Sequence, residues 1–194
     1  MIVVVDTSIL LPLLQPGTSV PKPPAGIDPG SATRRIEHLI DELDAQRAVA
    51  LVPTPVLSEL LIRADASAAD LLSRLAALRV FRISPFDERA AIECAMLLAA
   101  RLRSTRKSMP ATRATVKFDH QIVAIAKIHG AIRIYSDNRD DFEPICKPAG
   151  IEVVGLWELP EPPVDPQPSL PLDAPDPAGK GGLSPLPRRR PVPG

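Results

Sequence analysis

Ile2-Val3-Val4-Val5-Asp6, near the start of the chain, is a run of β-branched residues that ends directly in a carboxylate. A short stretch that is apolar at every position is typical of a parallel strand buried on both faces. Active sites of open parallel sheets form at the carboxyl ends of their strands. This stretch therefore predicts an α/β fold and makes Asp6 a candidate functional residue.

Strand and helix patterns alternate along the rest of the chain. Further strands are predicted at 48–52, 80–83, 132–135 and 151–154, and helices at 7–14, 33–46, from 54 onward, 67–78, 85–102, 114–129 and 142–149. Such alternation indicates a parallel sheet with helices on its faces. We predict a three-layer α/β/α sandwich with a central, mostly parallel five-stranded sheet.

Proline divides the sequence into a folded part and a tail. Of the 24 prolines, twelve follow Leu159, together with four glycines. Such a segment cannot bury enough apolar surface to offset the entropy lost on ordering. We predict one domain over residues 1–159, with a Pro- and Gly-rich loop at 15–31, and a disordered tail over residues 160–194.

The composition excludes several classes of protein. Two cysteines, Cys94 and Cys146, cannot form a disulfide framework or a four-ligand zinc site. No apolar run is long enough to span a bilayer, and the N-terminus lacks the features of a signal peptide. We therefore predict a cytoplasmic protein with no membrane partner. With 23 basic and 23 acidic residues, any binding of nucleic acid must depend on a local patch, and residues 101–117 carry only basic charges.

Four acidic residues from separate segments are predicted to meet at one edge of the sheet. Asp6 and Asp137 each follow a strand, and Glu59 lies one turn into the helix after the second strand. Asp119 precedes Ile122 by three residues and so lies beside the apolar side of its helix. Clustered carboxylates in a partly buried cleft need a counter-cation, and their oxygens suit hard divalent ions. Taken one at a time, Asp6 could be only a turn or cap residue and Glu59 a solvated helix residue. Asp119 is harder to explain in this way, because an unpaired carboxylate on an apolar face is costly.

The order of these motifs resembles that of PIN domains, and most closely that of VapC-like toxins of type II toxin–antitoxin modules. The resemblance covers roughly residues 1–159. It is carried by Val5-Asp6-Thr7-Ser8, Val56-Leu57-Ser58-Glu59-Leu60, Lys117-Phe118-Asp119-His120-Gln121-Ile122-Val123-Ala124-Ile125-Ala126 and Ile134-Tyr135-Ser136-Asp137. The loop at 15–31 is longer and richer in proline than is usual in compact toxins, and the tail is an addition.

The resemblance implies a metal-dependent endoribonuclease that hydrolyses RNA with one or two Mg²⁺ or Mn²⁺ ions. Asp6, Glu59 and Asp119 match the first three acidic positions and would be catalytic, metal-binding residues. Asp137 is assigned the fourth position, with Asn138 or Asp141 left open as alternatives. Thr7 or Ser8 would hold the Asp6 side chain in place.

The same resemblance implies an RNA substrate, a cognate antitoxin protein and a possible homodimer. One alternative is a PIN-like module that binds RNA or protein without cutting. Another is a phosphatase-like metal hydrolase, but its first motif has two acids separated by one residue, which Asp6-Thr7-Ser8 lacks. His38, His120 and His129 are interpreted as surface or packing residues and not as a zinc site.

Overall fold

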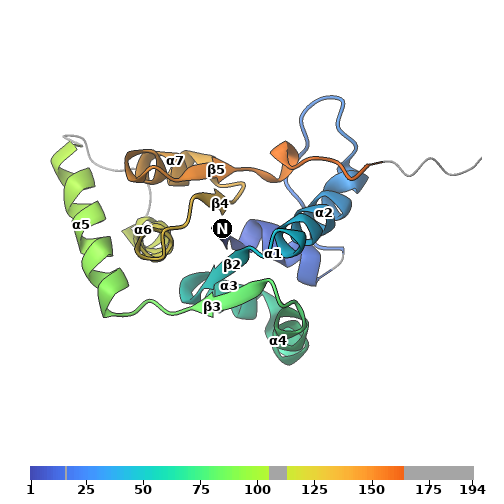
Figure 1. The fold of residues 1–194 in the computed structure, drawn as a ribbon, viewed down its shortest axis with the longest axis horizontal. Helices are drawn as coiled ribbons and strands as arrows, with labels where there is room; N and C mark the ends of the chain where they lie inside the picture. Colours follow the sequence, from blue (N-terminus) through green and yellow to red (C-terminus); the bar gives the residue numbers. More distant parts are fainter. Residues whose placement is uncertain (16, 105–112, 164–194) are drawn as a thin grey trace, which may run out of the picture. The chain divides into compact units, whose positions relative to one another are not determined.

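Five parallel strands form the central sheet, in the order β3-β2-β1-β4-β5 (Figure 1). They are β1 (Ile2–Val5), β2 (Val49–Pro53), β3 (Phe81–Ser84), β4 (Arg133–Tyr135) and β5 (Glu152–Val154). The computed structural model of the chain describes residues 1–15, 17–104 and 113–163, and the side chains within these ranges apart from those of 102–117. In the central register, Val4 pairs with Leu51 on one side and with Ile134 on the other.

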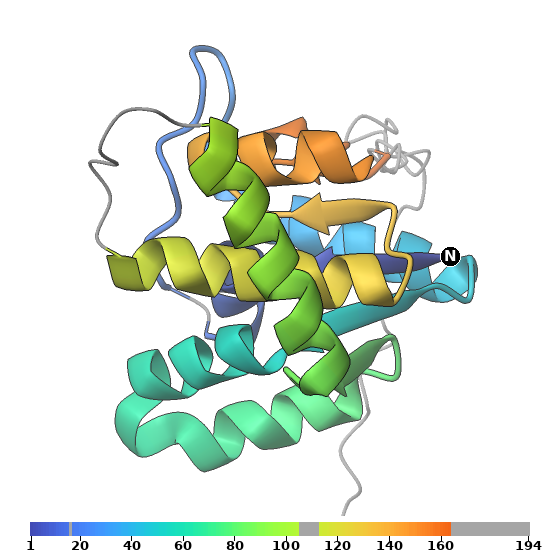
Figure 2. The same ribbon diagram turned by 90° about the vertical axis from the view of Figure 1, so that its left-hand side faces the viewer.

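Helices connect each strand to the next. They are α1 (Thr7–Leu14), α2 (Ala32–Ala45), α3 (Thr54–Ala64), α4 (Ala68–Ala77), α5 (Glu88–Ser104), α6 (Arg113–Ile128) and α7 (Arg139–Cys146), with short 3-10 turns η1 (Pro29–Ser31), η2 (Asp65–Ser67), η3 (Lys147–Ala149) and η4 (Leu156–Glu158). Figure 1 shows α5 and α6 on one side of the sheet and α1, α2 and α4 on the other. In Figure 2, α5 crosses the outer side of α6. The predicted α/β/α architecture with a five-stranded parallel sheet is therefore confirmed.

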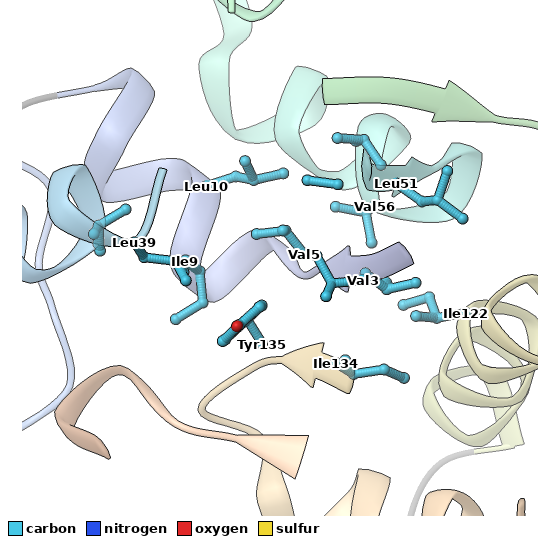
Figure 3. Close-up of a cluster of buried hydrophobic side chains, with 14 of the residues drawn as sticks. Val3, Val5, Ile9, Leu10, Leu39, Leu51, Val56, Ile122, Ile134 and Tyr135 are labelled. Carbon is cyan, nitrogen blue, oxygen red and sulfur yellow. The ribbon is translucent and has the colours of Figure 1, made fainter. Parts of the chain in front are cut away.

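The central strand is buried on both faces, as its sequence predicts. Val3, Val4 and Val5 have no exposed surface. Figure 3 shows Val3 and Val5 in one apolar cluster with side chains from β2, β4 and α6, among them Ile122 and Ile134. Burial of β1 fixes the place of Asp6, because the carboxylate follows directly on the most enclosed strand.

Two local expectations differ from the structure. Helix α7 begins at Arg139, three residues before the predicted start, with Asp140 and Asp141 in its first turn. Acids in the first turn stabilise a helix because they lie near the positive end of its dipole. The prediction used only the spacing of apolar residues and therefore missed this start. Ser31 precedes the helix predicted at 33–46, and its residue type predicts that it caps that helix. In the structure its hydroxyl donates to the carbonyl of Asp28 and does not cap α2.

Among the residues that the structure describes, no helix is both long enough and apolar enough to cross a membrane.

A buried arginine links α2 to the segment that follows the last turn. Arg35 is only 7% exposed, and its guanidinium donates to the carbonyl oxygen of Leu159 and pairs with the carboxylate of Glu161. The compact unit accordingly extends over Met1–Pro162. Glu161 lies beyond the boundary predicted at residue 159, and the predicted tail lies outside the described residues from residue 164 onward.

This contact gives a first prediction about truncation. A chain that ends at Pro163 should keep the unfolding free energy of the full chain. The same chain with Glu161→Gln should lose ~0.5–1 kcal/mol, because the buried guanidinium then lacks its charged partner, while water screens the half-exposed carboxylate. Urea unfolding of the two chains measures the difference, and Glu37→Gln, which changes an exposed acid on α2, is the matched control. Equal stability of the chains with and without Glu161→Gln would contradict the role given to Arg35.

Candidate functional site

Asp6 is held rigidly at the carboxyl end of β1. Its N–H donates to the carbonyl of Tyr135 at 3.0 Å. Its Oδ2 accepts hydrogen bonds from the hydroxyls of Ser8, at 3.0 Å, and Ser136, at 2.8 Å. Burial raises the pKa of Asp6, while the two serines and the backbone of Thr7 act against that rise. The expectation that Ser8 holds the Asp6 side chain in place is confirmed. The same role of Ser136 was not predicted.

Asp119 lies on the inner side of α6 and is 7% exposed, which confirms its predicted place beside the apolar stripe. Burial, as the largest cause, and the negative charges of Asp141, Asp6 and Glu59 together raise its pKa to about 7. The positive charge of Arg101 lowers the same pKa. Asp119 therefore lies within electrostatic reach of three other acids, which are Asp6 directly after β1, Glu59 on α3 and Asp141 on α7.

Glu59 joins α3 to α1. Its Oε2 accepts a hydrogen bond from Thr7 Oγ1 at 2.9 Å. Its Oε1 accepts from Arg63 Nε at 3.0 Å and from Arg63 Nη2 at 2.8 Å, one turn further along α3. Both carboxylate oxygens are therefore engaged by this chain's own side chains.

The Asp137 carboxylate binds the backbone of a segment that the other predicted acids do not contact. Its Oδ1 accepts from the N–H of Leu156 at 2.7 Å, at the start of η4. Its pKa is raised by burial and by the charge of Glu158, and lowered by the Leu156 N–H. The structure thus does not bring this carboxylate into contact with Asp6 or Asp119. Among the charges that shift the pKa of Asp119, that of Asp141 has the largest effect.

A cavity of about 710 Å³ lies over the other three predicted acids. Asp6, Glu59 and Asp119 line it, as does Asn138, one of the alternatives for the fourth position. The cavity has the size of an ordinary ligand site, roughly 300–1,000 Å³. The structure therefore brings together three of the four predicted site residues.

The donor set in this cavity fits a hard divalent cation in its chemistry. All the acids offer oxygen ligands, and the raised pKa values of Asp6 and Asp119 reflect burial and mutual repulsion that a cation would relieve. With the side chains as they stand, no group of three His, Cys, Asp or Glu residues in the described ranges is arranged to hold a metal ion. Glu59 in particular is engaged by Arg63.

The three histidines have different surroundings. His38 lies 3.5 Å from Glu42 on α2, His129 lies 2.8 Å from the hydroxyl of Ser84, and His120 is fully buried. Of the basic stretch at 101–117, only Arg101 has a described side chain, so the predicted basic patch lies mostly outside the described residues.

The different surroundings of Asp137 and Asp141 give a second prediction. Asp141→Asn should lower the pKa of Asp119 towards its ordinary value and reduce any metal-dependent activity roughly tenfold, because a charge facing the cluster is lost. Asp137→Asn should act mainly on stability, because its carboxylate binds the Leu156 N–H. NMR titration of Asp119 measures the first effect. Asp140→Asn, a neighbour in the same turn, is the control. A larger loss of activity at Asp137 than at Asp141 would return the fourth position to Asp137.

Comparisons with known proteins find similarity in fold and not in sequence. No protein-family model and no curated protein matches the chain. The VapBC2 complex of Rickettsia felis, bound to a fragment of its promoter DNA, contains a chain that aligns with a TM-score of 0.55 at 15% identity, covering 80% of this chain and 98% of that one. A chain of DNA-bound VapBC from Salmonella typhimurium aligns with a TM-score of 0.53 at 16% identity, over 80% and 98%. One of FitAcB from Neisseria gonorrhoeae aligns with a TM-score of 0.52 at 18% identity, over 81% and 99%. The likeness to VapC-like PIN domains is thus confirmed at the level of the fold.

Proposed function

We propose that this chain is a metal-dependent endoribonuclease and the toxin of a toxin–antitoxin module. The observation that carries the proposal is the cavity in which Asp6, Glu59 and Asp119 converge from three elements. It opens at the carboxyl ends of the strands, where parallel sheets hold their active sites. The shared fold with the VapBC and FitAcB structures supports the same reading.

The acids of the cavity, and the side chains that bind them, have distinct roles in the proposed reaction. Asp6 and Asp119, with Asp141 or Asn138, would hold Mg²⁺ or Mn²⁺. Such an ion supplies positive charge to the scissile phosphate and makes water a better nucleophile. Ser8 and Ser136 keep Asp6 in one orientation. Thr7 and Arg63 do the same for Glu59, which would orient the attacking water or bind the ion once Arg63 moves to the phosphate.

The rival candidate is a PIN-like module that binds RNA or protein without cutting. The ion pair between Arg63 and Glu59 favours it, because Arg63 already neutralises one acid of the cluster. Exposed ion pairs are weak, however, on the order of 0–1 kcal/mol, so a divalent ion or a phosphate can displace this one. We therefore place the nuclease first.

Incubation of the purified full chain with mixed RNA separates these candidates. Cleavage should appear with Mg²⁺ or Mn²⁺ and disappear with EDTA, and Asp119→Asn purified in the same way should be inactive, which excludes a contaminating nuclease. RNA that binds but stays intact with either metal would establish the non-catalytic module in its place.

The proposed antitoxin partner has a separate test. A free endoribonuclease would damage its own host, and the similar structures from Rickettsia felis and Neisseria gonorrhoeae are those of VapBC2 and FitAcB. Expression of the wild-type chain should arrest growth, the adjacent gene should relieve the arrest, and Asp119→Asn should be harmless. Unimpeded growth with the wild-type chain would favour a housekeeping nuclease.

A further inference from the structure

Apolar side chains line the cavity together with the acids, and one of them is an exposed aromatic ring. Phe118 lines the cavity and is 49% exposed, although aromatic residues make up only 3% of the chain. Ile62 lines it as well and is 75% exposed. Single exposed apolar residues are ordinary on protein surfaces. Two that share a cavity with three acids call for a chemical explanation.

Both apolar side chains are placed by the helices that carry the acids. Phe118 immediately precedes Asp119 on α6, and Ile122, one turn later, lines the same cavity. Ile62 follows Glu59 by three residues on α3, a spacing that puts the two on one side of the helix. Both helices that present an acid to the cavity, α3 and α6, therefore also present a large apolar side chain to it.

A nucleotide has the same two-sided chemistry. Its phosphate needs cations, and its base has flat faces that stack on aromatic rings. We propose that Phe118 is a stacking platform for a nucleobase next to the cleaved phosphodiester, so that the cavity takes unpaired RNA. A base within a duplex cannot offer its face to the ring, because its neighbours in the helix cover it. The inference deepens the proposed function and rests on it.

Binding measurements without cleavage test this inference. The full chain carrying Asp119→Asn, which should not cleave, is titrated in excess Mg²⁺ into a short fluorescent single-stranded RNA and into the same strand with abasic riboses in place of its bases. Adding Phe118→Ala should weaken binding of the normal strand by roughly 5- to 100-fold and leave binding of the abasic strand unchanged. Adding Phe118→Trp should preserve the preference for the normal strand.

The matched control is Ile92→Ala, which removes a side chain that is 57% exposed on α5 and does not line the cavity. It should leave both affinities unchanged, and circular dichroism confirms that each variant is folded. Equal weakening of both strands by Phe118→Ala would overturn the stacking role. So would unchanged RNA affinity together with weaker binding of the adjacent gene's product, which would make Phe118 a protein contact.

The outcome also separates this inference from the proposed function. If the Asp119→Asn chain binds neither strand, the cavity does not take RNA, and the proposed function and this inference are both overturned. If it binds both strands equally well before Phe118 is changed, the cavity takes RNA through its backbone, and only the role of Phe118 is overturned.

Discussion

Asp119→Asn is expected to abolish RNA cleavage, with a fall in rate of roughly 100-fold or more. The substitution keeps the shape of a side chain that is 7% exposed, so the packing of α6 should not change. It removes the acid on which the charges of Asp141, Asp6 and Glu59 all act, and which therefore has the greatest need of a counter-cation. Affinity for the proposed ion should fall with the rate.

Single-turnover cleavage of a labelled RNA over a range of Mn²⁺ concentrations measures both quantities. Asp70→Asn is the matched control, because Asp70 is an exposed acid on α4 that pairs with Arg74 and does not line the cavity. It should cleave at the wild-type rate. An Asp119→Asn chain that cuts RNA like the wild type would refute the proposed metal cluster.

Much of the fold could be predicted because its central elements have unambiguous local patterns. The strand Ile2–Val5 and the helix Thr7–Leu14 have the bounds that the sequence predicts. Their residues are mostly apolar and mostly buried, so the packing agrees with the local preference. The position of Asp6 follows from this strand alone.

The direction of individual side chains could not be predicted in the same way. Asp137 follows β4, as expected, but its carboxylate binds the N–H of Leu156, nineteen residues later in the chain. Arg35 likewise finds its partners at Leu159 and Glu161. Such contacts depend on how distant segments pack, which residue spacing does not reveal.

One feature of the site did have a signal in the sequence. Glu59 precedes Arg63 by four residues on a helix, the arrangement in which an acid and a base pair most favourably. The pair ties up one of the predicted ligands. Its presence means that the metal-free site carries its own counter-charge, and that binding of an ion or of a phosphate must compete with Arg63.

The pKa of Asp119 predicts that the metal-free protein loses stability as the pH rises. This pKa is about 7 in the folded chain, against an ordinary value of 3.8. Between these values the folded state holds a proton that the unfolded state has released, so the free energy of unfolding falls as pH increases. The difference corresponds to ~4 kcal/mol at most. Water in the open cavity screens part of it, and we expect a loss of ~1–3 kcal/mol.

Asp119→Asn should remove this loss, because asparagine does not titrate. In EDTA the variant should match the wild type near pH 4 and exceed it by ~1–3 kcal/mol near pH 8, as measured by urea unfolding. Addition of Mg²⁺ near pH 8 should stabilise the wild type and leave the variant unchanged, since only the wild type keeps the full set of ligands. Asp70→Asn should follow the wild-type curve throughout. Curves for Asp119→Asn and wild type that stay parallel from pH 4 to pH 8 would show that Asp119 already ionises at its ordinary pKa, and that the acids do not repel one another as the geometry of the cavity requires.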